Sequence, residues 1–151
     1  MITVNGLPIH PLLVHFVLVL LPGASLLAIL GSVWPAAQRK FTFLTPLLAL
    51  VGLILVPITV TAGENLADHM GIGAAINEHA TLARRILPFA IGLFVTSAGQ
   101  WAYLRFVRRR TWMTVLIALL VIAAAIATTV QVVLTGDAGA HAVWGGIGGA
   151  K

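Results

Sequence analysis

The sequence predicts an all-α integral membrane protein, a bundle of four helices that crosses the bilayer up, down, up and down. Composition is the first reason, because 60% of the 151 residues are hydrophobic and only 9% are charged. A soluble domain is about half apolar and about one quarter charged. The second reason is that the apolar residues fall into four stretches, each near the ~20 residues that a helix needs to cross a bilayer. None of the four alternates like a membrane β-strand, so helices are expected.

The whole chain, residues 1–151, is expected to form one transmembrane domain. The expected helices cover residues 11–33, 41–62, 86–107 and 112–134, with an outer loop at 63–85 and an outer tail at 135–151. Pro11 suits the first turn of the first helix, where a missing N–H is no loss. Small residues at helical spacing are expected to form the contact faces between helices. They are Ala24, Ala28 and Gly31, then Gly92, Thr96 and Gly99, then Ala123, Ala124 and Ala127. The sequence shows no internal repeat.

The basic residues predict how the bundle is oriented. One end of the expected bundle has no acidic residue and carries Arg39, Lys40, Arg105, Arg108, Arg109 and Arg110. The positive-inside rule places this end in the cytoplasm, so both termini are expected on the outer side of a bacterial cytoplasmic membrane. Residues 1–9 contain no Lys or Arg. The first apolar stretch is therefore expected to be a membrane helix rather than a cleaved signal peptide.

Several classes of function are excluded by what the chain lacks. It has no cysteine, which excludes disulfides, thiolate metal sites and cysteine nucleophiles. Its basic residues lie at an expected membrane boundary without base-reading groups, so the lipid bilayer is the expected partner and nucleic acid is not. No set of nucleophile, base and acid stands out, and the chain is not expected to be an enzyme on its own.

The histidines are the most informative polar residues, because all five lie toward the expected outer end. They are His10, His15, His69, His79 and His141. His15 lies about one turn inside an apolar stretch, where an unpaired polar group is costly, so it is expected to be functional. His10 is expected to precede the helix. His79 is the expected partner of His15, because the first and third helices of such a bundle face each other diagonally.

Two imidazoles that face each other across a bundle are typical of a haem b site. In this interpretation His15 and His79 ligate the iron, and Arg84 or Arg85 pairs with the propionates. The alternative is a Zn, Cu or Fe ion near the outer surface. Its ligands would come from His10, His15, His69, His79, Asp68 and Glu64.

A third interpretation needs no cofactor. His15 would hydrogen-bond a backbone carbonyl or Gln131, and the protein would be a structural or accessory subunit of a larger membrane complex. His141 lies in a glycine-rich stretch that is expected to be a flexible outer tail, or else a lid over the histidines.

Four segments resemble a widespread bacterial family of four-helix membrane domains of unknown function. They are GLPIHPLLVHF, TAGENLADH, NEHATL and TGDAGAHAVWGG. The opening HPLLVHF is the most specific of them, although relatives usually read HFP where this chain has Val17. Some relatives are fused to Rieske iron–sulfur or c-type cytochrome modules, which implies electron transfer with redox partner proteins and favours haem. The resemblance marks His10, His15, His69 and His79 as motif positions and implies no catalytic residues.

Overall fold

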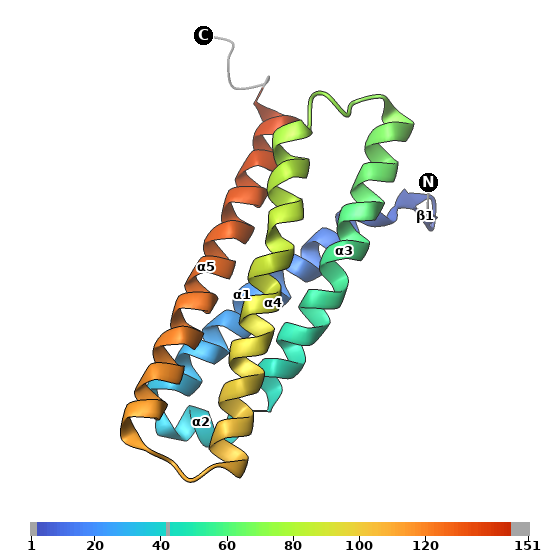
Figure 1. Cartoon of the computed structure of the whole chain (residues 1–151). Coiled ribbons are helices and arrows are strands. Elements are labelled where there is room, and N and C mark those ends of the chain that lie inside the picture. Colours follow the sequence, from blue (N-terminus) through green and yellow to red (C-terminus); the bar gives the residue numbers. More distant parts are fainter. Residues whose placement is uncertain (1–2, 42, 146–151) are drawn as a thin grey trace.

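Four long helices dominate the structure, a computed structural model that describes residues 3–41 and 43–145. A short hairpin of β1 (Thr3–Val4) and β2 (Leu7–Pro8) precedes them. The helices in this part of the chain are α1 (Ile9–Val33), α2 (Pro35–Phe41), α3 (Leu44–Met70), α4 (Asn77–Phe106) and α5 (Thr111–Trp144). All but α2 are long and apolar enough to cross a membrane. Figure 1 shows α3, α4 and α5 running alongside one another with α1 crossing behind them, and consecutive long helices are joined at opposite ends of the bundle.

At the end of the bundle that holds the histidines, three helices extend beyond their expected bounds. α3 continues to Met70 and stops where Gly71 takes a left-handed φ of 67°. α4 already begins at Asn77, so the expected loop at 63–85 is reduced to residues 71–76. α5 continues past Gly136 to Trp144, and the expected flexible tail is helical up to that residue. Apolarity marks the part of a helix that faces lipid, whereas a helix ends only where its hydrogen-bond pattern is interrupted.

The first helix also starts earlier than expected. Asn5 and Gly6 have positive φ angles of 52° and 82°, a pairing typical of a tight two-residue hairpin turn. The hairpin leads directly into α1 at Ile9, so His10 lies in the first turn of the helix instead of before it.

Small residues make up much of the centre of the bundle beside a few large ones such as Leu21 and Leu93, while many large apolar side chains face outward. Fully buried alanines come from each long helix: Ala24, Ala49, Ala90 and Ala125. The expected contact face of the first helix is correct, because Ala24, Ala28 and Gly31 are all buried. That of the third expected helix is wrong, because none of its three residues is among the buried residues of α4.

This difference predicts opposite outcomes for two Leu substitutions. Ala125→Leu is expected to lower the free energy of unfolding by about 1–3 kcal/mol, because the buried site has no room for three more carbons. Gly92→Leu is expected to be tolerated, since open space surrounds its Cβ. Unfolding of both variants in detergent measures the effect, and equal destabilisation would show that α4 packs on a different face.

The two halves of the bundle repeat the same pattern of buried positions. α1 and α4 each pack against both α3 and α5. Buried positions of α1 recur at constant spacing in α4: Val17, Leu21, Ala24, Ala28 and Gly31 match Ile86, Ala90, Leu93, Ser97 and Gln100. Those of α3 recur in α5: Thr45, Ala49, Gly52, Val56 and Thr59 match Val121, Ala125, Thr128, Val132 and Thr135. The hairpin α1–α3 is thus equivalent to α4–α5, an arrangement familiar in membrane proteins.

Candidate functional site

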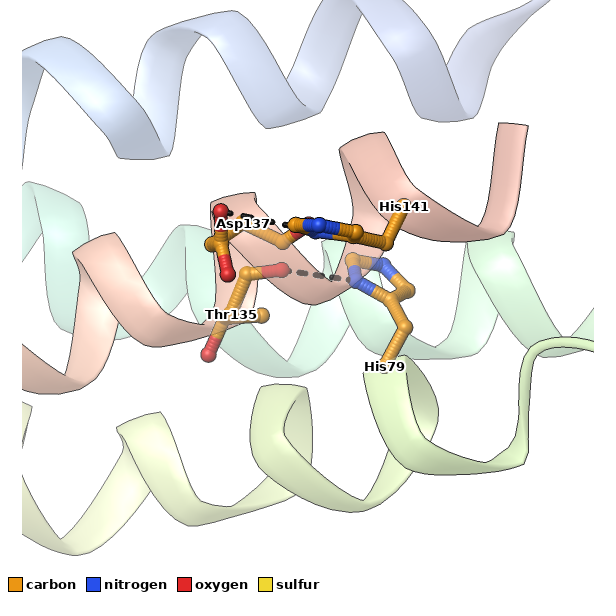
Figure 2. A network of polar contacts seen from close by, with 4 residues as sticks. All are labelled: His79, Thr135, Asp137 and His141. Atoms are coloured by element: carbon orange, nitrogen blue, oxygen red, sulfur yellow. Dashed lines mark hydrogen bonds and ion pairs between the residues drawn. The ribbon is translucent and has the colours of Figure 1, made fainter. Parts of the chain in front are cut away.

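Two histidines occupy equivalent places in the two halves. His10 in the first turn of α1 has its Nδ1 3.0 Å from the carbonyl oxygen of Thr59 on α3. His79 in the first turn of α4 has its Nδ1 2.9 Å from the carbonyl oxygen of Thr135 on α5 (Figure 2). A carbonyl only accepts hydrogen bonds, so Nδ1 carries the proton in both rings. In the neutral imidazole the lone pair is then on Nε2.

A glycine one turn after each threonine provides room for the ring. A Cβ added at Gly63 would lie 2.6 Å from Cε1 of His10, and one at Gly139 would lie 2.9 Å from Nδ1 of His79. Thr59 and Thr135 also bond their hydroxyls to the carbonyls one turn earlier in their own helices. Each Thr-x-x-x-Gly segment therefore forms a seat for an imidazole, made of one carbonyl oxygen and one gap in the helix surface.

Both imidazoles line one cavity of about 60 Å³. Its remaining walls are almost entirely apolar, and most come in pairs from equivalent positions of the two halves. These pairs are Val14 with Ala83, Val17 with Ile86, Val56 with Val132, and Val60 with Gly136. The cavity thus lies between the equivalent halves, and its volume is enough for a few small molecules such as water.

His15 does not face this cavity, so its expected placement opposite His79 is wrong. It is exposed, and its Nδ1 bonds the carbonyl of Pro11 within α1. On a helix with 3.6 residues per turn, residues five apart point about 140° apart. Because α1 begins at Ile9, His10 is the one that points inward and His15 points outward.

The remaining expected site residues lie around the same end of the bundle without lining the cavity. Arg84 on α4 forms an ion pair with Glu64 on α3, with Nη2 2.6 Å from Oε1. Arg85 is exposed on the next position of α4. Asp68 and His69 are exposed near the end of α3.

The expected metal site is not assembled. In residues 3–41 and 43–145, no group of three or more histidines and carboxylates is placed to hold a metal ion. The reason is that the six expected ligands lie on three helices and mostly face outward, while only His10 and His79 point into the cavity.

His141 belongs to a helix rather than to a tail. It lies on α5 and is exposed, with its Nδ1 3.0 Å from the backbone oxygen and 3.5 Å from the carboxylate of Asp137 (Figure 2). It is not among the residues that line the cavity. Gln131 is not a partner of His15 either, because its Nε2 donates to the carbonyl of Leu82 and joins α5 to α4.

The four long apolar helices define a multi-pass membrane protein with a histidine-lined cavity near one end of the bundle. Over residues 6–150 the chain matches the family described as predicted membrane protein (DUF2231), and it belongs to that family. No curated protein and no solved structure matches the chain.

Proposed function

We propose that the protein is a membrane electron-transfer subunit that binds haem b between His10 and His79. The observation that carries the proposal is the equivalent placement of two imidazoles on α1 and α4, both with Nδ1 bonded to a carbonyl and both lining one cavity. Histidines that ligate metals almost always donate their second ring N–H to a carbonyl or carboxylate. Axial imidazoles on facing helices are a common way to hold haem in a bundle.

In this proposal the chain's residues have separate roles. His10 and His79 supply Nε2 to the iron, and the carbonyls of Thr59 and Thr135 fix the tautomer and make the rings better ligands. The valines give the cavity apolar walls, which lower the dielectric around the site. Arg85, exposed one position beyond the Arg84 ion pair, is available to a propionate. A bound haem supplies one-electron transfer.

The donors fit a haem, but the space between them does not fit it without a change of conformation. The cavity of about 60 Å³ is far smaller than the several hundred Å³ of a typical cofactor pocket. Binding therefore requires the hairpin α1–α3 and the hairpin α4–α5 to move apart at this end, while each ring keeps its bond to the threonine carbonyl of its own hairpin. Both histidines lie in the first turn of a helix, and helix ends open at lower free energy than the centre of a bundle.

An absorption spectrum tests the proposal directly. The purified protein is titrated with haem in detergent, and we expect one equivalent to give the sharp reduced bands of a six-coordinate bis-imidazole haem. His15→Asn is the matched control, because it removes an imidazole that points away from the cavity, and we expect its spectrum to be unchanged. A wild-type protein that gives only the broad spectrum of free haem would refute the proposal.

A second candidate function follows from the same two hydrogen bonds. They join α1 to α3 and α4 to α5, so the imidazoles can act as clamps between helices in a cofactor-free accessory subunit of a larger membrane complex. This candidate predicts no haem spectrum. It also predicts that His10→Ala lowers the free energy of unfolding by about 1–3 kcal/mol, because the carbonyl of Thr59 loses its donor.

A further inference from the structure

A second cavity lies at the opposite end of the bundle, where α2 meets the end of α4. Its volume is about 180 Å³, and it is lined by Gln38, Arg39, Trp101, Leu104, Arg105 and Arg109. The three arginines come from three different segments: α2, α4 and the connection between α4 and α5. Charges that only set the orientation of a membrane protein need not converge in this way. Lys40, Arg108 and Arg110 belong to the same basic end but do not line the cavity.

No carboxylate compensates these charges. The four acidic residues of the chain are Glu64, Asp68, Glu78 and Asp137. All of them lie toward the other end, in the last part of α3, the first turn of α4 and the last part of α5 (Figure 1). In the described part of the chain, the ion pairs are Arg84 with Glu64 and His141 with Asp137, so neither uses a lining arginine.

Side chains next to the cavity hold it in shape and place it at a membrane boundary. Nη1 of Arg109 donates to Oε1 of Gln38 at 3.4 Å, and Nε2 of Gln38 donates to the carbonyl of Gly31 at 3.2 Å, which connects the arginine to α1. Trp101 contacts Phe43 with its ring tilted and Phe106 edge to face, with ring centroids 5.8 Å and 5.7 Å apart. Tryptophan is enriched at the headgroup level of a bilayer.

We propose that this cavity, the arginine pocket, binds a phosphate group, and that the phosphate is that of an anionic lipid headgroup. A guanidinium group binds phosphate oxygens with paired hydrogen bonds, whereas the ammonium group of lysine acts as a point charge. Three guanidinium groups around one cavity therefore favour a phosphate as the ligand. Basic pockets between helices at a membrane boundary are known to hold anionic headgroups. The proposal is independent of the histidine site and of which side of the membrane this end faces.

Lipid titration of the purified full-length protein in a neutral detergent tests the proposal. Phosphatidylglycerol, phosphatidylcholine and inorganic phosphate are added separately, and binding is followed by the thermal midpoint and by native mass spectrometry. We expect saturable binding of phosphatidylglycerol that is weakened roughly tenfold in Arg39→Gln and in Arg105→Gln, as for the loss of one charge-assisted hydrogen bond. Arg108→Gln removes the same charge outside the pocket, and we expect it to change binding by less than about twofold.

Each outcome decides the proposal. Binding of phosphatidylglycerol alone, with the expected difference between variants, supports a lipid site. Competition by inorganic phosphate at millimolar concentration would show that the same pocket serves a free anion, and it would overturn the lipid as occupant. Equal weakening in Arg108→Gln and Arg105→Gln, or binding of phosphatidylcholine as tight as that of phosphatidylglycerol, would overturn the pocket itself.

Discussion

His10→Asn and His79→Asn are each expected to abolish the six-coordinate haem spectrum while the bundle stays folded. Asparagine has an amide nitrogen at the δ position, so it can still donate to the carbonyl of Thr59 or Thr135. It has no nitrogen with a free lone pair and cannot ligate iron. Disturbing a partner of a metal ligand already weakens binding by about 10–100-fold, and we expect the loss of the ligand itself to weaken it by more.

Two measurements on the same samples distinguish the role of the histidines as haem ligands from their role as clamps between helices. Haem titration gives the affinity, and thermal unfolding in detergent gives the stability without haem. We expect the Asn variants to unfold close to the wild type, and His10→Ala to unfold earlier. Loss of the spectrum in His15→Asn but not in His10→Asn would contradict the assignment, because His15 faces outward. Equal haem affinity in all variants would leave the clamp as the function of both histidines.

The four long helices could be predicted from the sequence because their apolar stretches are long and interrupted by few charges. The helix ends near the histidines could not be predicted, since α3 and α5 continue as helix through polar residues such as Glu64 and Asp137. The start of α1 has the largest consequence for the candidate site. Asn5 and Gly6 are a recognisable hairpin signal, and the hairpin brings the start of α1 to Ile9. With that start, His10 rather than His15 is the imidazole that points into the bundle.

The equivalence of the two halves is only partly visible in the sequence. Ala49, Val56 and Thr59 of α3 recur as Ala125, Val132 and Thr135 of α5, whereas the matched positions of α1 and α4 share burial and not identity. Leu21 corresponds to Ala90, and Ala24 corresponds to Leu93. A large residue in one half is thus matched by a small residue at the equivalent position of the other half. Packing conserves the total volume of a core more strictly than the residue at any one place. The halves also share a histidine at a helix start and a Thr-x-x-x-Gly segment on the partner helix.

Gly63→Ala is expected to destabilise the wild-type protein but to stabilise the protein when His10 is replaced by alanine. In the wild type the added methyl would lie 2.6 Å from Cε1 of His10. The ring must move and its bond to Thr59 is lost, so we expect a destabilisation of about 1–3 kcal/mol. In the His10→Ala background the three atoms nearest to the methyl are gone. Alanine then stabilises the interior of α3 by roughly 0.5–1 kcal/mol relative to glycine.

The double-mutant cycle therefore measures the coupling energy between Gly63 and His10. It uses the free energies of unfolding of both single variants and of the double variant. Gly92→Ala is the control, because its Cβ would meet nothing within 4 Å and its effect should not depend on His10. A Gly63→Ala penalty that persists without the imidazole would show that something other than His10 occupies the gap.

His79 and Gly139 form the equivalent cycle in the other half. Because each ring is held by one carbonyl and one glycine gap, the two couplings should have the same sign and be independent of each other. A coupling in only one half would mean that the two imidazoles are not equivalent, and a ligand held between them would then bind through one histidine more strongly than through the other.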